Sequence, residues 1–517
     1  MEFFAKLPEG LGHLLSLQPL LALIAGTLLG FVFGLIPGLQ SITALVVILP
    51  FTFGMDPIVA MYLFAGVIGA SGQGGSVTAI TLGVPGTAQN AATVIDGFQF
   101  TKRGEASRAL GIAAGTAMLG ATFGLVVLLL FIPVFLPFLL YFGPAEIFWI
   151  MAFGLVSMSA VLPGPFFKGL FGVTLGIVLS TIGYGGPTIA VARFNFGSSY
   201  LLDGLDLVAV IIGLLVVSES LVYLFDRKRA PVLPASERPR MKVQWRAFAA
   251  GLIEPARYPG LILRCSAIGT LIGALPGIGG VIAQFMSYNA AYATSRHKEE
   301  FGKGSVEGLI ASQAAIDAKE GGSLLPTFIF GIPGNGEMAL VLAAWTIHGL
   351  HPGPFFLSNH ADLAWALILG LFVSNLLATG LVLTCSFVAA RVPNLRPDYV
   401  GLSIIVMAVI AVIAVRSNLW DIALVLAIGL LGYLLGLARI SVIGVVIGFI
   451  LGRLMEFNFY TALQSGLGQL SIFVSSVISV VLAIATAAII VLVIARAMRR
   501  FWAARMARVG LPSGEGR

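Results

Sequence analysis

Four proline–glycine pairs interrupt apolar stretches of this chain, and they have the strongest potential for chemistry in the sequence. Proline removes a backbone donor and glycine frees the backbone, so each pair breaks a helix. In hydrocarbon an unpaired backbone group costs several kcal/mol, so such a break survives only where protein buries it or water reaches it. The half-helix that follows presents free N–H groups and a positive dipole end, which favour anions. The pairs are Pro37-Gly38, Pro85-Gly86, Pro276-Gly277 and Pro333-Gly334.

Small and polar residues surround the four pairs, as an intramembrane site for a carboxylate requires. A single pair is usually explained by a kinked helix that packs closely on its neighbours. Four pairs at related places instead favour a binding site. Besides the pairs themselves, we expect the substrate-binding residues to be Ser41, Gly74, Gly75, Ser76, Thr87, Asn90, Gly279, Gly321, Gly322, Ser323 and Asn335.

Ionisable residues inside apolar regions are a second sign of a site, because burying them in a membrane is expensive. Asp317, Lys319 and Glu320 lie close together in one such region, where they could neutralise one another as a structural network. The alternative is that a carboxylate binds a coupling ion. The candidates for that role are Asp96, Asp317 and Glu337.

The composition predicts the elements that hold these residues. Of 517 residues, 58% are hydrophobic and 10% are charged, and the mean hydropathy is +1.00. Soluble domains carry about 25% charged residues. Residues 109–142, 147–167, 169–192 and 457–495 contain no charge. Roughly 20 apolar residues span a membrane as a helix, and these runs lack the alternation of barrel strands. We therefore expect an all-α polytopic membrane protein with roughly 11–15 membrane segments, some of them broken or re-entrant.

Other features limit the possible functions. Cys265 and Cys385 both lie in apolar stretches, so we expect neither a disulfide framework nor a metal site. No cofactor is expected apart from Na⁺ or H⁺ as a coupling ion. The N-terminus lacks the order of a signal peptide, so residues 13–35 are interpreted as a retained segment. The net charge of +7 lies mainly in loops and the C-terminal tail, where membrane topology rather than nucleic acid accounts for it.

An internal repeat organises the chain. Gly34–Leu39 recurs as Gly273–Ile278 at an offset of 239, and Gly83–Thr87 recurs as Gly331–Asn335 at an offset of 248. Between them, Gly74-Gly75-Ser76 recurs as Gly321-Gly322-Ser323 at an offset of 247. We expect an N-terminal membrane repeat over 1–225, a basic cytoplasmic linker over 226–258, a C-terminal membrane repeat over 259–500 and a cytoplasmic tail over 501–517.

Positive charges predict that the two repeats have opposite orientations. Lys102-Arg103 follows the first Val-Pro-Gly, whereas the second Ile-Pro-Gly is followed by His348–Pro354, which has no Lys or Arg. Positive residues mark the cytoplasmic side, so these two loops should face opposite sides of the membrane. The result is an inverted-topology repeat. The basic tail places the C-terminus in the cytoplasm, and the N-terminus then falls outside.

At these signatures the sequence resembles the large membrane subunit of tripartite tricarboxylate transporters, the TctA family. The matching stretches lie in order between about residue 26 and 356. They are Gly34–Leu39, Leu49–Phe53 with Asp56-Pro57, Gly74–Ala79, Gly83–Thr87, Thr93 with Asp96-Gly97, Arg193–Gly197 with Asp203-Gly204, Leu275–Gly280, Phe301–Gly308, Gly321–Pro326, Gly331–Gly334 and His348–Pro354.

The resemblance implies partners and a mode of transport. Members work with a small four-helix membrane subunit and a periplasmic substrate-binding protein in the bacterial inner membrane. They import di- and tricarboxylates, including aromatic ones, with an ion gradient rather than ATP. The chain has no phosphate-binding G-x-x-x-x-G-K-[ST] loop. No catalytic residues are expected.

The chain also departs from the family pattern. Many members carry Tyr where this chain has Gln73, and Glu-Ala-x-Asn-Asn-Ala where it has Gln313–Ala318. A carboxylate has thus become Gln313, and two amides have become Ile316 and Asp317. These positions are expected to line the site, which makes Gln313 a further coupling-ion candidate and puts citrate as the substrate in doubt.

Two other functions compete with transport. Gly69-Ala70-Ser71-Gly72 fits the G-x-S-G pattern of rhomboid proteases, and a histidine could supply a base. The pattern is short, and glycine packing explains it as well. A channel for ions or anions is the other alternative, although the sequence has no ring of charges to support it.

Overall fold

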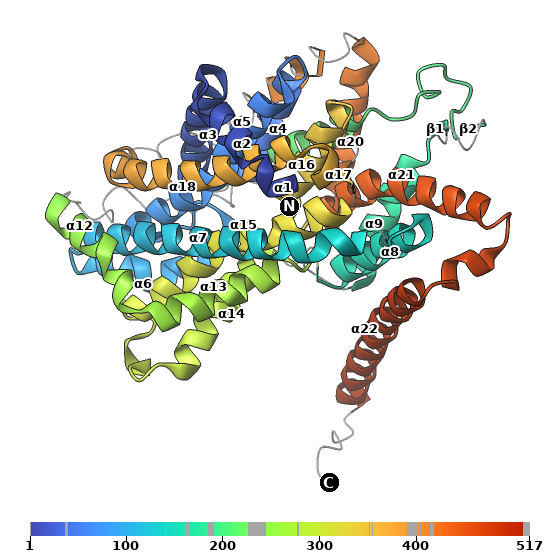
Figure 1. Cartoon of the computed structure of the whole chain (residues 1–517). Helices are drawn as coiled ribbons and strands as arrows, with labels where there is room; N and C mark the ends of the chain where they lie inside the picture. The colour runs from blue at the N-terminus through green and yellow to red at the C-terminus, as the bar shows by residue number, and fades with distance from the viewer. Residues whose placement is uncertain are drawn as a thin grey trace. The chain divides into compact units, whose positions relative to one another are not determined.

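The computed structural model is helical throughout almost all of the chain that it describes (Figure 1). Every statement below concerns these described residues. They are residues 2–36, 40–139, 141–161, 166–184, 191–225, 244–276, 279–350, 352–353, 355–389, 402, 405–406, 408–410, 412–413 and 418–509.

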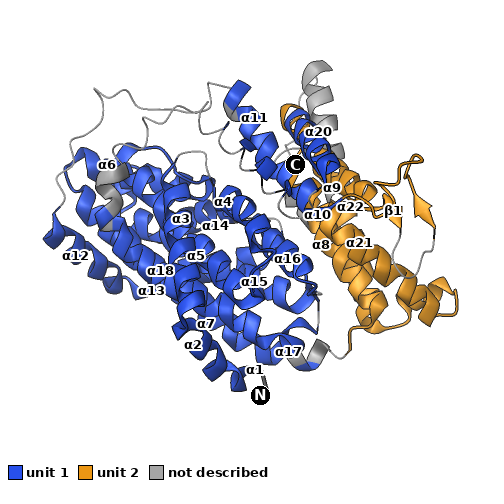
Figure 2. Cartoon of the chain, turned by 90° about the horizontal axis from the view of Figure 1, so that it is seen from above, with its two compact units in different colours: residues 1–140, 206–434 blue, residues 141–205, 435–517 orange. Residues whose placement is uncertain are grey.

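The chain forms two compact units, and each combines two separate stretches of sequence (Figure 2). The first unit contains Met1–Leu140 and Asp206–Leu434. Its helices before residue 140 are α1 (Glu2–Ala5), α2 (Leu7–Leu15), α3 (Leu17–Leu35), α4 (Ser41–Ile48), η1 (Leu49–Thr52), α5 (Pro57–Leu82), η2 (Ala88–Asn90), α6 (Ala91–Lys102) and α7 (Ala106–Leu139). The helices of its later stretch are α10 (Leu207–Ile211), the π-helix η3 (Ile212–Val217), α11 (Ser218–Phe225), α12 (Trp245–Ile253), η6 (Glu254–Arg257), α13 (Pro259–Gly273), α14 (Gly279–Thr294), η7 (Lys298–Glu300), α15 (Val306–Phe330), α16 (Gly336–Ile347), α17 (Phe356–Asn359), α18 (Ala361–Ala389) and α20 (Leu419–Leu437).

The second unit contains Tyr141–Leu205 and Leu435–Arg517. Its elements are α8 (Pro144–Val161), α9 (Phe166–Ser180), β1 (Gly183–Tyr184), β2 (Ala192–Arg193), α21 (Val442–Ser465), η9 (Leu470–Val474) and α22 (Val477–Val509). The two short strands pair antiparallel, with Gly183 opposite Arg193. Arg193 forms an ion pair with Glu456 of α21 at 2.6 Å, which ties the strands to that helix.

The helices are long and apolar enough for a membrane protein. Six described helices have the length and composition to cross a membrane: α3, α5, residues 106–135 of α7, residues 361–382 of α18, α20 and α21. Shorter apolar helices, among them α4, α13 and α16, accompany them. The prediction of an all-α polytopic membrane protein is thus confirmed, and half-length helices are part of its architecture.

The sequence repeat is also a structural repeat within the first unit. The helices α3, α4, α5, α6 and α7 correspond in order to α13, α14, α15, α16 and α18. Glycines of α3 pack directly against the backbone of α5, with Gly30 at Val67 and Gly34 at Ser71. The matching contacts in the second repeat place Gly269 against Ala315 and Gly273 against Lys319. No side chain fits at these contacts, so glycine is what lets the helix pairs approach so closely.

The contacts correct the register of one repeated motif. Gly74 lies against Phe31, and its structural counterpart Gly322 lies against Thr270. Gly74 therefore corresponds to Gly322 rather than to Gly321, one residue away from the pairing of the Gly-Gly-Ser motifs. The same offset of 248 holds at the Pro-Gly breaks. Gly86 lies against Gly75, and the equivalent Gly334 lies against the equivalent Ser323.

The equivalent helices α5 and α15 run in opposite directions where they cross. Ser76 of α5 donates a hydrogen bond to Gln313 of α15 at 3.0 Å. One turn earlier on α5, Gly72 faces Asp317, which lies one turn later than Gln313 on α15. Each of the two helices also packs on the last helix of the other repeat, α5 on α18 and α15 on α7 (Figure 1). The inverted relation predicted from charge thus agrees with the helix directions. Which end faces the cytoplasm stays a prediction.

The linker predicted over 226–258 contains a helix in its second part. Residues 226–243 lie outside the described residues, whereas α12 packs on α7 through Gly111 and Phe248. Arg108 of α7 pairs with Glu254 at 2.6 Å beside this contact. The boundaries of repeats, linker and tail stay predictions.

Candidate functional site

Both long helices of the repeat end at a glycine in the left-handed region. Gly83 after α5 has φ of +68°, and Gly331 after α15 has φ of +67°. Glycine adopts this conformation at no steric cost, and it is the usual way to end a helix. The Pro-Gly pairs follow at once, and the next helical residues are Ala88 and Gly336. The breaks predicted at Pro85 and Pro333 are therefore present.

After the first break the chain returns to the middle of α5. The backbone N–H of Gly86 donates to the carbonyl of Gly75 at 3.3 Å, and the Gly34 carbonyl lies directly against its Cα. Asn90 then donates from Nδ2 to the Gly72 carbonyl at 3.1 Å and to the Ser76 hydroxyl at 2.8 Å. The N-terminus of α6 consequently lies beside the middle of α5 rather than at its end.

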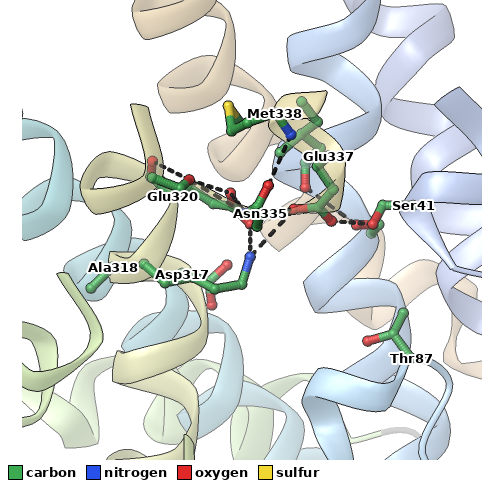
Figure 3. A network of polar contacts seen from close by, with 12 residues as sticks. Ser41, Thr87, Asp317, Ala318, Glu320, Asn335, Glu337 and Met338 are labelled. Atoms are coloured by element: carbon green, nitrogen blue, oxygen red, sulfur yellow. Dashed lines mark hydrogen bonds and ion pairs between the residues drawn. The ribbon is translucent and has the colours of Figure 1, made fainter. Parts of the chain in front are cut away.

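The second break has the same geometry. Gly334 packs on Ser323 in α15, and Asn335 donates to the Ser323 hydroxyl at 3.4 Å. The Asn335 side chain accepts a hydrogen bond from the Met338 N–H at 2.9 Å, which caps α16. The start of α16 thus lies beside the middle of α15 (Figure 3).

The remaining two half-helices begin at the same place. Ser41, the first residue of α4, donates a hydrogen bond to Glu337 in the first turn of α16. Gly280, near the start of α14, lies against the side chains of Lys319 and Gln89. Gln284 of α14 accepts from the Ala92 N–H at 2.8 Å, so α14 also meets the start of α6. Pro37, Gly38 and Gly277 lie outside the described residues.

The four N-termini form two facing pairs, which we call pair one (α6 and α14) and pair two (α4 and α16). The repeat exchanges them, so Gln89 in pair one occupies the position of Glu337 in pair two. The N-terminus of a helix carries a partial positive charge and backbone N–H groups without a partner inside the helix. In pair two the carboxylate of Glu337, which is 5% exposed, lies in the first turn of α16 and accepts a hydrogen bond from Ser41 at the start of α4. The equivalent position in pair one is the neutral amide of Gln89, which lies beside Gly280 near the start of α14.

A charged cluster lies next to pair two. Lys319, 2% exposed, bonds through Nζ to Glu320 and at 3.3 Å to Glu337. Asn335 donates to both carboxylates, at 3.4 Å to Glu320 and at 3.3 Å to Glu337. Figure 3 shows Ser41 and Asn335 on opposite sides of Glu337, while Thr87 of pair one stands apart from these contacts. The buried carboxylate of Glu337 and the partly buried carboxylate of Glu320 therefore share one ammonium group.

The Asp317 side chain is not bonded to that cluster but lies beside Gly72 of α5 and Asn375 of α18. Its Oδ1 accepts a hydrogen bond from Asn375 Nδ2 at 3.2 Å. Asn375 in turn accepts at Oδ1 from Gln73 Nε2 at 3.0 Å. Oδ2 of Asp317 is buried and has no hydrogen-bond partner among the described residues.

The other two coupling-ion candidates are engaged in contacts between the repeats. Asp96, 1% exposed, accepts from the N–H groups of Gly302, Gly304 and Ser305 at 2.8–2.9 Å and from the Tyr288 hydroxyl at 2.8 Å. Its oxygens thus hold the loop before α15. Gln313 donates to Thr93 at 2.7 Å and accepts from Ser76.

The predicted substrate residues fall into two groups. Those at the breaks gather around the four N-termini: Ser41, Gly75, Ser76, Pro85, Gly86, Thr87, Asn90, Pro276, Gly279, Ser323, Pro333, Gly334 and Asn335. Gly74, Gly321 and Gly322 instead contact the backbones of α3, α7 and α13. These three glycines pack helices together where the sequence predicts ligand contacts, because a helix presents only one face to the centre.

Sequence reasoning missed the contribution of α18. Asn375 and Thr379 reach Gln73 and Asp317 from a helix that follows the last recognisable motif. A polar residue inside an apolar span was the available signal, since such residues usually serve a purpose.

The fold and this centre define a multi-pass membrane transport protein, with inverted repeats whose broken helices meet in the middle. The chain belongs to the Tripartite tricarboxylate transporter TctA family, whose model matches residues 20–447. It is 29% identical over 494 residues to an uncharacterized 52.8 kDa protein in the TAR-I ttuC' 3' region of Agrobacterium vitis, covering 95% of this chain and 96% of the relative. A second uncharacterized protein of that organism, in the TAR-II ttuC' 3' region, is 31% identical over 213 residues, 41% of this chain and 87% of the relative. No solved structure matches the chain.

Proposed function

We propose that this chain is the large membrane subunit of a secondary transporter that imports small organic anions, di- or tricarboxylates, together with Na⁺ or H⁺. Membership in the family supports the partners: a small four-helix membrane subunit and a periplasmic substrate-binding protein. The chain would lie in the bacterial inner membrane, with its C-terminus in the cytoplasm. The single observation that carries the proposal is the meeting of four half-helix N-termini in the middle of α5 and α15.

The anion is expected at pair one. Pair two already holds the carboxylate of Glu337, which bonds to Ser41 at the start of α4 and offsets the positive dipole ends of α4 and α16. In pair one the neutral Gln89 leaves the corresponding charge absent, and the side chains of Gln89 and Lys319 lie against Gly280 near the start of α14. A Cβ at Gly280 would lie 2.6 Å from Lys319 Cε, so the lysine stem reaches this place. A substrate carboxylate there would meet helix N-termini and the nearest buried ammonium.

Alternating access follows from the inverted repeat. The binding protein delivers the anion to the outer face, where we place the Asp56-Pro57 loop and the His348–Pro354 loop. His351 and Pro354 of the second loop lie outside the described residues. Movement of one repeat against the other then opens the centre to the cytoplasm, as in other transporters built from inverted repeats. The coupling ion offsets the charge that the anion brings into a low-dielectric centre.

The breaks themselves give the test. Gly86 lies against Gly34, Gly75 and Thr78, and Gly334 lies against Ser323, so valine at either position would push the half-helix out of place. Gly86→Val and Gly334→Val should each abolish uptake of radiolabelled citrate, malate or terephthalate by cells of the native bacterium, whichever of these the wild type takes up. Gly380→Val is the matched control, because nothing lies within 4 Å of a Cβ on that glycine of α18.

Protein levels in the membrane must stay comparable for the test to count. Wild-type uptake should also disappear when the gene for the secreted binding protein is deleted. Normal uptake in both glycine variants, with the control also normal, would remove the breaks from the site.

A further inference from the structure

Asp317 is a buried acid in the middle of three unbroken helices. It lies on α15 opposite Gly72 of α5 and Asn375 of α18, and its side chain is 6% exposed. Its single hydrogen-bond donor among the described residues is Asn375 Nδ2, at 3.2 Å from Oδ1. The second oxygen has no partner there. A carboxylate normally accepts several hydrogen bonds when it is buried, so an unsatisfied oxygen needs an explanation.

The amide that faces Asp317 is fixed in orientation. Gln73 Nε2 donates to both Asn375 oxygens, at 3.0 Å to Oδ1 and at 2.9 Å to the backbone carbonyl. Thr379 donates to Gln73 Oε1 at 3.4 Å. Because Asn375 Oδ1 is occupied by Gln73, its NH₂ group must point at Asp317. The surroundings of the acid on α18 therefore supply a donor and no oxygen ligand.

No cation in the described structure is assigned to Asp317. The charged groups that act on it are Lys319 on its own helix and Glu337 on α16, while its printed contacts on α5 and α18 are the neutral Gly72 and Asn375. Lys319 is already bound to Glu320 and Glu337. Asp317 thus forms no ion pair with the described residues, and a charge left uncompensated in such a place is expensive.

We propose that Asp317 binds and releases the proton that accompanies the transported anion. The inference rests on the proposed function and names its coupling ion. The proton comes from water on the side to which the centre is open, adds to Oδ2 of the carboxylate, and returns to water on the other side. Only an O–H bond forms and breaks, and no electrons are exchanged with another group.

The surroundings favour a proton over Na⁺. Hard cations require several oxygen ligands at once, and in transporters these come from unwound backbone. Here α5, α15 and α18 are continuous, so their carbonyls are engaged in the helix ladders. The Gly72 carbonyl also accepts from Asn90 and Ser76. A group of three or more His, Cys, Asp or Glu side chains that could hold a metal is absent from the described residues.

Proton binding would be linked to anion binding through charge. With Asp317 ionised, an arriving anion meets three carboxylates and one ammonium in a medium that screens poorly. Protonation removes one negative charge from α15 close to the anion site. The two ligands should therefore bind together more readily than either alone, which is the requirement for symport.

The experiment separates coupling from transport. Right-side-out membrane vesicles from the native bacterium, carrying the full chain and its partners, are supplied with periplasmic extract and radiolabelled citrate, malate or terephthalate. For the wild type, an inward proton gradient without Na⁺ should drive accumulation. Asp317→Asn should lose at least about tenfold of this accumulation, yet still exchange external for internal anion. Glu299→Gln, an exposed acid in η7, is the control and should behave as the wild type.

A second measurement does not need the substrate. Infrared absorption of the purified full-length chain should show a buried protonated carboxyl band that titrates with pH and is missing in Asp317→Asn. If that variant does not reach the membrane, Asp317→Glu should keep coupling with a displaced pH dependence.

Three results would overturn the proton site: accumulation driven by Na⁺ and indifferent to pH, gradient-driven accumulation in Asp317→Asn, or an unchanged carboxyl band in that variant. Absence of all anion uptake by the wild type would instead count against the proposed function, and the infrared band would still decide on the proton.

Discussion

The two repeats share a backbone and differ in charge. Both contain glycine contacts between their first and third helices, a left-handed glycine at the end of the third, and a Pro-Gly break that returns to its middle. At the positions where the second repeat carries Lys319, Glu320 and Glu337, the first carries Ser71, Gly72 and Gln89. The repeated features are those that shape the backbone, whereas the side chains at the centre have diverged.

This difference separates two requirements of a transporter. In the proposed transport cycle, two states of similar energy require two similar scaffolds that can exchange roles, and the repeated glycine contacts would supply these scaffolds. A defined cargo requires a site that is not symmetric, since a symmetric one would hold two equal anions. Glu337 places the protein's own carboxylate at one pair of helix N-termini, and in the proposed function the other pair binds the ligand. We therefore expect the repeated residues to maintain the backbone and the residues that differ between the repeats to determine which anion is bound.

The largest expected effect concerns the inversion itself. Lys102 and Leu350 are equivalent positions after the half-helices α6 and α16, and they should face opposite sides of the membrane. In a background with Cys265 and Cys385 replaced by alanine, Lys102→Cys should react with an impermeant maleimide only from the cytoplasm, and Leu350→Cys only from outside. Labelling is read in intact cells and in inverted vesicles. Reaction of both cysteines from one side would end the comparison of inverted repeats.

The next prediction removes the cation that only the second repeat has. Lys319→Met leaves the carboxylates of Glu320, partly buried, and Glu337, buried, without their ammonium partner. Removing one member of a buried ion pair destabilises a protein by about 3–5 kcal/mol. The variant should therefore show a lower unfolding temperature in detergent, followed by tryptophan fluorescence, and less protein in the membrane.

The matched control for Lys319→Met neutralises the partners as well. Lys319→Met combined with Glu320→Gln and Glu337→Gln removes all three charges, and the first repeat shows that the scaffold tolerates neutral groups at these positions. Most of the lost stability should return in this triple variant. A single variant as stable as the wild type would mean that the cluster is not a network of charges.

The breaks and the repeat could be predicted from the sequence because they depend on local residue types. Proline and glycine act on the backbone wherever they stand, so Pro85 and Pro333 were sufficient to place both interruptions. The one-residue shift that pairs Gly74 with Gly322 could not be seen, since it depends on which backbone each glycine touches. The contact between Asp317 and Asn375 was hidden for a similar reason: it joins helices 58 residues apart in the chain.

The role of Lys319 shows the limit in another way. The sequence predicted that Asp317, Lys319 and Glu320 could neutralise one another, because they are neighbours in the chain. In the structure Lys319 bonds to Glu320 and to Glu337, whereas Asp317 turns to α18. Residues two apart on a helix point in different directions, so proximity in sequence was a poor guide to the partner.

The last prediction makes the first repeat resemble the second. Gln89→Glu would place a carboxylate at the N-termini of α6 and α14, as Glu337 does for α4 and α16, and it would occupy the proposed anion position. Uptake should fall about 100-fold, the equivalent of roughly 2.7 kcal/mol, because the substrate must displace a covalently attached competitor. Gln89→Met, neutral and of similar length, should retain far more uptake than Gln89→Glu. If the two variants lose uptake equally, the amide of Gln89 itself is needed and pair one does not bind the anion through its helix ends.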